Sequence, residues 1–328
     1  MKTSLGLLAT ISTSLLAGVF LVSSAAAGEH YPSRPVKIIV PYPAGGPTDA
    51  VARLLGGKLG AALGGSFYIE NVPGAAGSLG ARAAGGAVPD GYTLLCMNQD
   101  FVVQPLIKAS TPYDAVNGFT PVSLVAQAPE AIFVHPSVPA KSVGELIALL
   151  KANPGKYAYA TPGFGTTPHL AGERLFKLTH HLDVAHVPFQ GAAPAVMSTM
   201  GGHTQILLIT VGAAAANVMD GSLRVLAVAS PKRWPAFPDV PTMAEAGVPE
   251  HEAEFILGVM APAGTAAPII DTLSKEIARA LAEQEIRGRF EALGLQPIGG
   301  TPLELAAKLH ATWNNWSSVI HGAGIKTN

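Results

Sequence analysis

Apolar and polar positions follow one another in short blocks along the chain, and the spacing within each block predicts its secondary structure. Runs of β-branched and other apolar residues at 36–40, 67–70 and 93–97 predict strands. Between them, Ala- and Leu-rich stretches at 49–63 and 78–87 predict helices. This order of strand, helix, strand, helix and strand predicts a parallel sheet with right-handed crossovers.

A second series of the same kind follows and extends to residue 229. Strands are predicted at 122–126, 131–134, 157–160, 185–188, 205–209 and 223–229, and helices at 143–152, 168–178, 194–200 and 213–220. Ser142 and Glu145 have the spacing of a capping box, which marks the start of the first of these helices. The sequence therefore predicts an α/β fold.

The last third of the chain has a different pattern. Residues 232–249 are rich in proline and irregular, and residues 255–260 predict one more strand. Two long helices follow. The first is predicted from 265 to 293, and the second begins with the capping box of Thr301 and Glu304, with proline at the first helical position.

The two series need not form two consecutive domains, although 328 residues suffice for about two. We expect the chain to cross between two lobes near 119–125 and to return near 228–240. The first and last thirds then form one lobe. The predicted division is lobe 1 at 28–122 and 235–328, and lobe 2 at 123–234.

The N-terminus has the pattern of a secretory signal. Lys2 is the only charge before Glu29, residues 5–22 are almost entirely apolar or small, and three alanines end at Ala27. This pattern predicts a signal peptide of residues 1–27, cleaved after Ala27, and a periplasmic mature protein. A retained membrane anchor is the alternative, but glycines interrupt the stretch and no stop-transfer charges follow it.

Charge and cysteine content narrow the possible partners. The formal net charge is −1 and basic runs are absent from the sequence, which argues against nucleic acid as a partner. Cys96, the single cysteine, lies in an apolar run and is expected to be a buried thiol that forms no intramolecular disulfide. We expect a monomer without a cofactor or a metal ion.

Three loops carry the candidate chemistry, each between a predicted strand and a predicted helix, where α/β sheets bind ligands. Loop 41–49 contains paired glycines, which turn tightly and expose backbone N–H groups. Thr48 or Asp49 is expected to cap the helix, whose first N–H groups favour an anion. Taken alone, this loop is explained more simply as an ordinary strand-to-helix turn with glycines for its geometry.

Two further loops repeat that design. Loop 161–169 places the hydroxyls of Thr166 and Thr167 ahead of a helix that begins with proline. Loop 188–194 is a turn of small residues in which Phe189 offers an apolar wall and Gln190 a polar contact. Three such loops from two series predict facing rims that suit an anion.

Many ordered motifs resemble the Bug (TctC-like) family, the extracytoplasmic binding proteins of tripartite tricarboxylate transport systems. The motifs span the mature chain and include 31–36, 45–53, 70–77, 89–95, 163–169, 186–191, 238–245 and 261–265. The resemblance implies a two-lobe periplasmic-binding-protein fold, type II-like, in which each lobe is a mostly parallel sheet flanked by helices. It also implies an interlobe cleft that closes on a small carboxylate, and docking of the closed form on membrane permease subunits.

The resemblance further implies which residues contact the ligand. The predicted contacts are Tyr42, Ala44, Gly45, Gly46, Thr48, Asp49, Gly163, Gly165, Thr166, Thr167, His169, Phe189, Gln190, Gly191 and Ala192. Asp49 differs from the others because a carboxylate repels an anion. We expect it to hold the loop or a helix N-terminus, or to meet a ligand amine.

Two other kinds of site were weighed. A secreted α/β hydrolase or esterase would use Ser78 in the sequence Ala76-Gly77-Ser78-Leu79-Gly80, but a nucleophile elbow needs a strand directly before the serine. Ser78 is better placed as a helix cap. A metal site would use the histidines at positions 169, 180, 181 and 186, but their spacing fits no zinc pattern.

Overall fold

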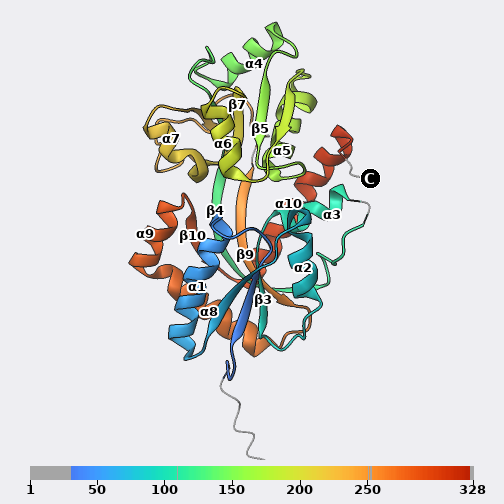
Figure 1. Ribbon diagram of the computed structural model, residues 1–328, viewed down its shortest axis with the longest axis vertical. Helices are drawn as coiled ribbons and strands as arrows, with labels where there is room; N and C mark the ends of the chain where they lie inside the picture. Colours follow the sequence, from blue (N-terminus) through green and yellow to red (C-terminus); the bar gives the residue numbers. More distant parts are fainter. Residues whose placement is uncertain (1–30, 109, 250, 252, 326–328) are drawn as a thin grey trace, which may run out of the picture. The chain divides into compact units, whose positions relative to one another are not determined.

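The computed structural model describes residues 31–108, 110–249, 251 and 253–325 (Figure 1). The predicted signal peptide, residues 1–27, lies outside these ranges. Among the helices within them, none combines the length and the apolar character that a membrane span requires.

The first strands form a parallel arrangement, as predicted. Strands β1 (Val36–Val40), β2 (Phe67–Asn71) and β3 (Thr93–Asn98) pair in the order β2-β1-β3. Helices α1 (Pro47–Leu63) and α2 (Ser78–Gly85) connect them. Every residue of β1 except the half-buried Lys37 is buried, which explains its continuous apolar run.

A second parallel arrangement follows. Strands β5 (Ala158–Thr161), β6 (Ala185–Pro188) and β7 (Ile206–Thr210) pair in the order β6-β5-β7. Helix α5 (Thr167–Gly172) follows β5, and α6 (Ala192–Met200) follows β6. Both crossovers were predicted, and the helix predicted at 168–178 is α5 followed directly by the π-helix η2 (Glu173–Thr179).

Strand β4 (Phe119–Val134) is one continuous strand, whereas two separate strands were predicted. From Phe119 to Pro129 it pairs antiparallel with β9 (Glu254–Pro262), and from Glu130 onward with β7 and with β8 (Arg224–Val228). Strands β4 and β9 therefore join the two parallel arrangements (Figure 1). Strand β9 runs antiparallel to both β3 and β4, so the sheet is mixed where the two parallel arrangements join.

Other elements complete the fold. They are η1 (Ala75–Gly77), α3 (Asp100–Ile107), α4 (Val143–Ala152), η2 (Glu173–Thr179), η3 (Val211–Ala214), α7 (Ala215–Met219), α8 (Ala267–Ala282), α9 (Gln284–Ala292), β10 (Gln296–Gly300) and α10 (Pro302–Ala323). The single helix predicted at 265–293 is two helices, because Glu283 between them has an extended backbone with ψ 133°. Neither α3 nor β10 was predicted.

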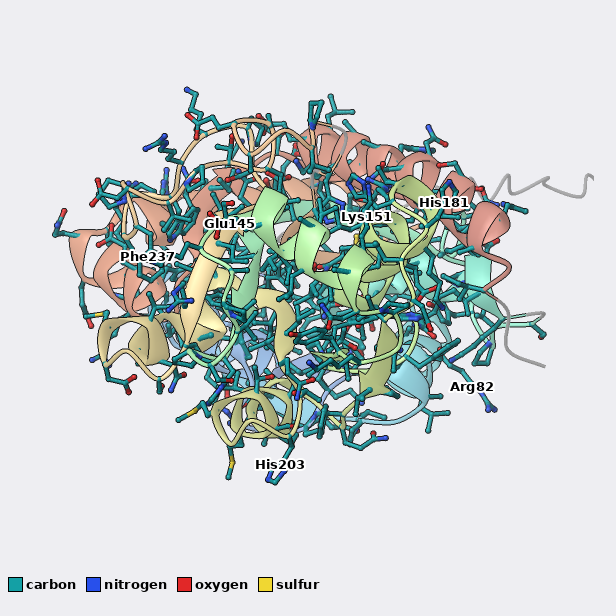
Figure 2. All side chains as sticks on the ribbon, turned by 90° about the horizontal axis from the view of Figure 1, so that it is seen from above. Arg82, Glu145, Lys151, His181, His203 and Phe237 are labelled. Atoms are coloured by element: carbon teal, nitrogen blue, oxygen red, sulfur yellow. The ribbon has the colours of Figure 1, made fainter. Side chains whose placement is uncertain are left out.

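Helix α10 packs against both strand arrangements. Leu305 and Leu309 lie in a core with residues of β3 and β9, whereas Trp316 and Ile320 lie in a core with residues of β5 and β7. Polar side chains such as Arg82 and His203 extend outward at the periphery (Figure 2). The lobe boundaries near 122 and 235 stay a prediction.

Candidate functional site

Loop 42–49 connects β1 to α1 and is held by a side chain of the helix. Gly46 is the N-cap residue of α1, and no side chain caps this helix, so the prediction that Thr48 or Asp49 does so was wrong. Instead, Oδ2 of Asp49 accepts a hydrogen bond of 2.9 Å from the N–H of Gly45. Gly45 has φ +86°, a conformation that glycine adopts without strain.

The Asp49 carboxylate has further partners that neutralise it locally. Arg53 donates to it from Nε at 3.0 Å and from Nη2 at 2.9 Å, and Asn71 donates at 2.9 Å. Burial alone would raise the pKa of Asp49, but the hydrogen bonds from Arg53, Gly45 and Asn71 hold this pKa below its usual value. Asp49 therefore holds the loop, as we expected from its charge.

Loop 163–169 is held in the same way. The N–H of Gly165, at φ +74°, donates to Nδ1 of His169 at 3.1 Å, again four residues further along the chain. Burial lowers the pKa of His169 to about 4, so the imidazole is neutral near pH 7 and its Nδ1 can accept the bond.

Loops 163–169 and 189–192 lie side by side. The N–H of Gly191 donates to the carbonyl of Pro162 at 2.9 Å, and that of Phe189 donates to Thr161 at 3.0 Å. Below them, the rings of His169 and His186 stack with their centroids 4.1 Å apart. The parallel pairing of β5 with β6 thus places two of the three predicted loops at one edge.

Two residues that sequence analysis missed connect loop 42–49 to loop 163–169. The hydroxyl of Tyr42 donates to Oδ1 of Asn98 at 2.5 Å, and the same oxygen accepts from the N–H of Asp100 at 2.9 Å. The hydroxyl of Thr167 lies 3.5 Å from Oδ1 of Asp100. Loops 42–49 and 163–169 therefore meet around the end of β3 and the start of α3, and loop 189–192 lies beside loop 163–169.

A signal for these residues was present in the sequence. Asn98, Gln99 and Asp100 directly follow the buried strand β3, at the same kind of strand-to-helix corner as the other loops. Their connection was missed because the helix after them was not predicted.

The predicted contacts differ in exposure. Thr48, Asp49, Gly165, Thr167 and His169 are buried; Tyr42, Gly46, Gly163, Thr166, Phe189, Gly191 and Ala192 are half-buried; Ala44, Gly45 and Gln190 are exposed. Asp49, Gly165, Thr167 and His169 hold the loops through the bonds described above. Direct ligand contact by all fifteen stays a prediction.

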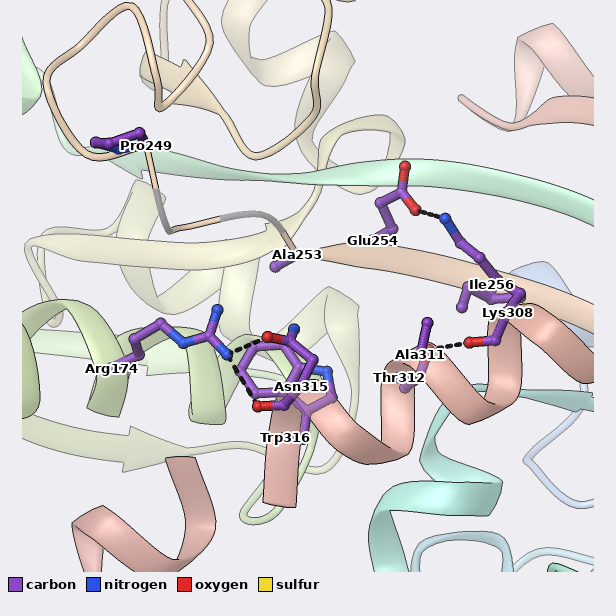
Figure 3. A pocket seen from close by; sticks show the side chains of 10 residues that line it. All are labelled: Arg174, Pro249, Ala253, Glu254, Ile256, Lys308, Ala311, Thr312, Asn315 and Trp316. Carbon is purple, nitrogen blue, oxygen red and sulfur yellow. Dashed lines mark hydrogen bonds and ion pairs between the residues drawn. The ribbon is translucent and has the colours of Figure 1, made fainter. Parts of the chain in front are cut away.

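A pocket of about 360 Å³ lies away from the predicted loops, between η2, the start of β9 and α10 (Figure 3). Its described lining includes none of the predicted contacts. Nη2 of Arg174 donates to the side chain of Asn315 at 2.8 Å, and Lys308 forms an ion pair with Glu254. These contacts connect α10 to its neighbours.

The surroundings of Ser78 do not fit a hydrolase. Ser78 is buried, it is the first residue of α2, and the 3-10 helix η1 precedes it where an elbow needs a strand. Its Oγ accepts from Nζ of Lys108 at 3.3 Å. Gly77 is the N-cap residue, so the expectation that Ser78 caps the helix was also wrong.

Metal binding by the histidines finds no geometric support. In the part of the chain that the structure describes, no three His, Cys, Asp or Glu side chains are arranged to hold a metal ion. His169 is stacked on His186 and accepts the bond from Gly165 instead.

Comparison with known proteins gives a consistent result. The family model described as "Tripartite tricarboxylate transporter family receptor" matches residues 51–325. Protein BugT from Bordetella pertussis is 35% identical over 322 residues, covering 96% of this chain and 98% of BugT.

Two solved structures are also similar. The R. palustris protein Rpa4515 with adipate is 32% identical, with a TM-score of 0.83, covering 90% of this chain and 99% of Rpa4515. MatC from Rhodopseudomonas palustris with bound malate is 30% identical, with a TM-score of 0.78, covering 88% of this chain and 100% of MatC.

The fold is thus the α/β fold of periplasmic binding proteins, and the protein is a solute-binding receptor, not an enzyme. More specifically, the chain belongs to the tripartite tricarboxylate transporter receptor family.

Proposed function

We propose that this receptor captures a small organic carboxylate between loop 42–49 on one side and loops 163–169 and 189–192 on the other. Free backbone N–H groups and hydroxyls of the loops bind the carboxylate, and Phe189 contributes an apolar wall. Two similar solved structures support a carboxylate ligand, because Rpa4515 was solved with adipate and MatC with bound malate.

The chain of contacts from Tyr42 through Asn98 and Asp100 to Thr167 carries this proposal. It connects a loop after β1 with a loop after β5, although the two strands belong to different parallel arrangements. A ligand that touches both loops would favour the conformation in which they are close. Strands β4 and β9, which lie between the two arrangements in the sheet, are the hinge in this mechanism.

We propose the remaining steps from the N-terminal sequence pattern and from membership of the family. The precursor is exported, residues 1–27 are removed after Ala27, and the mature monomer works in the periplasm. The ligand-bound form then docks on the membrane subunits of a tripartite tricarboxylate-type transporter.

Mass spectrometry of small molecules released from the purified, denatured protein tests the ligand class. Calorimetry with the released compound then measures its affinity. We expect a small carboxylate bound with one-to-one stoichiometry and a higher unfolding temperature at saturation. A protein that releases no carboxylate and binds none from a panel of small acids would contradict the proposal.

A further inference from the structure

Asp100 places a negative charge where the predicted loops meet. The side chain is buried at the first turn of α3 and accepts from both the backbone N–H and the hydroxyl of Thr167. It also lies one residue from Gln99, whose Oε1 accepts from the N–H of Ile256 in β9. The carboxylate therefore occupies hydrogen-bond donors at the start of α5 that had been assigned to the ligand.

This charge has no cation beside it among the described residues. Burial, Thr167 and Asn98 are the influences on the Asp100 carboxyl, and no lysine, arginine or histidine of residues 31–108, 110–249, 251 and 253–325 is among them. Lys108, at the end of the same helix, donates to the carbonyl of Ala75 and to Ser78 instead.

The titratable groups around Asp100 carry no positive charge that would neutralise its carboxylate. The charge of Asp100, together with burial, raises the pKa of Tyr42, of Tyr113 and of Glu130. All three are therefore neutral or negative at neutral pH. On α5, His169 follows Thr167 by two residues and is neutral near pH 7.

A second negative group close to Asp100 would bind poorly. With an effective dielectric constant of about 20, two like charges about 5 Å apart weaken binding by about two to three hundredfold. A ligand ammonium at the same place is attracted by Asp100, which strengthens binding by a similar factor. The ligand end that faces α5 is thus selected by its charge.

We propose that Asp100 is a specificity-determining residue that rejects a second ligand carboxylate and selects a ligand with one carboxylate and a cationic amine at the end near α5. This inference rests on the proposed function, since it assumes that the ligand lies between Tyr42 and Thr167. It narrows the ligand from carboxylates in general to amino-carboxylates.

Ionisation of Asp100 gives the inference a pH signature. Burial raises the pKa of Asp100 to about 6, so the group is mostly ionised at about pH 7.5 and mostly protonated at about pH 5. Rejection of a dicarboxylate should therefore weaken as the pH falls through about 6.

Matched ligand pairs test the inference by calorimetry. Each pair has the same chain length and differs only at one end: succinate against 4-aminobutyrate, glutarate against 5-aminopentanoate, and adipate against 6-aminohexanoate. Wild type is compared with Asp100→Asn, which keeps the size of the side chain and removes its charge. Asp271→Asn, at an exposed position on α8, is the control that changes net charge equally.

For the chain length that binds best, wild type at about pH 7.5 should prefer the amine by about tenfold or more. Asp100→Asn should shift the ratio toward the dicarboxylate by about tenfold or more, and Asp271→Asn should leave it unchanged. Wild type and Asp271→Asn, but not Asp100→Asn, should gain affinity for the dicarboxylate at about pH 5, since protonation of the ligand itself affects all variants equally.

Two failures can be distinguished. Tighter binding of the dicarboxylate by wild type, with a ratio that Asp100→Asn does not change, overturns the role of Asp100 and leaves the proposed function intact. If no compound of either series binds, and the purified protein releases no carboxylate, the proposed function and the inference are overturned together.

Discussion

The backbone N–H of Gly165 donates a 3.1 Å hydrogen bond to Nδ1 of His169, and Gly45 and Asp49 form the equivalent pair in the other half of the molecule. In both pairs a left-handed glycine of the loop is tied to a side chain in the first turn of the following helix. These two N–H groups are therefore occupied within the protein. A ligand bound at these loops must use their other N–H groups and hydroxyls.

Replacing His169 with Phe tests the bond in loop 163–169. Phenylalanine preserves an aromatic ring against His186 but leaves the buried N–H of Gly165 without its acceptor. We expect the free energy of unfolding, measured with urea, to fall by about 1–3 kcal/mol. His310→Phe, at an exposed position on α10, is the control and should change the free energy of unfolding little. Equal effects of the two substitutions would show that the bond contributes nothing.

The same bond predicts a pH dependence of stability. The pKa of His169 is about 4 in the folded protein and about 6.5 in an unfolded chain, so the unfolded state binds the proton more tightly. The stabilisation is complete above about pH 6.5 and is lost as the pH falls from there through about 4. Urea titrations across this range should show a shallower decline for His169→Phe than for wild type.

Asp49→Ala removes the acceptor that holds loop 42–49. The N–H of Gly45 and the Arg53 guanidinium lose their shared partner, and we expect the free energy of unfolding to fall by about 1 kcal/mol or more. Ligand affinity measured by calorimetry should fall as well, because the loop loses its fixed shape.

The pH dependence of this contribution has a definite sign. The pKa of Asp49 is lower in the folded protein than its usual value of about 3.9, so its stabilisation is present above that value and is lost as the pH falls through the folded pKa. Asp49→Ala should therefore lose less stability than wild type on acidification in that range. A parallel decline of both proteins would contradict the assigned role.

Gly46→Val separates binding from folding. A Cβ at Gly46 would have only the carbonyl oxygen of Pro43 within 4 Å, at 3.8 Å, and φ is −79°. The fold should therefore tolerate the side chain. The free energy of unfolding should fall by about 1 kcal/mol, because valine is a poorer N-cap residue than glycine. We expect ligand affinity in calorimetry to be lost, because the valine occupies the approach to the loop. Unchanged affinity would exclude Gly46 from the site.

Local patterns predicted the elements that their own residues determine. Strand β1 and the capping of α10 were predicted because a buried apolar run and a Thr-Pro-x-Glu signal act within a few residues. Helix α3 was missed because Pro105 lies inside it and its residues are mostly apolar on all sides. The break at Glu283 was missed because the residues around it are good helix formers, and packing decides where they stop.

The candidate site shows the same limit. The holding role of Asp49 was expected from its charge and position beside paired glycines. The contact between Asp100 and Thr167 joins residues that are 67 positions apart, and no local pattern relates them. Such contacts depend on how β3 and β5 are placed by β4 and β9, which the sequence pattern did not predict.

The capping box of α10 gives a prediction about the connection between the two strand arrangements. Glu304 donates its N–H to Oγ1 of Thr301 at 3.2 Å, and the N–H of Thr301 donates back to Oε2 of Glu304 at 2.6 Å. Thr301→Ala removes the acceptor for the helix N–H and should reduce the free energy of unfolding by about 1 kcal/mol. Urea denaturation measures this change.

Thr272→Ala is the matched control for that experiment. Thr272 is on α8, where its hydroxyl donates to the carbonyl of Pro268 and caps no N–H group. Alanine is the better helix former, so this variant should be as stable as wild type or slightly more so.

Hydrogen exchange shows where the loss of the cap acts. Because α10 packs into both cores, Thr301→Ala should increase exchange near Leu305 and Leu309 more than near Trp316. Uniform exchange along the helix would show that the cap does not control its first turns.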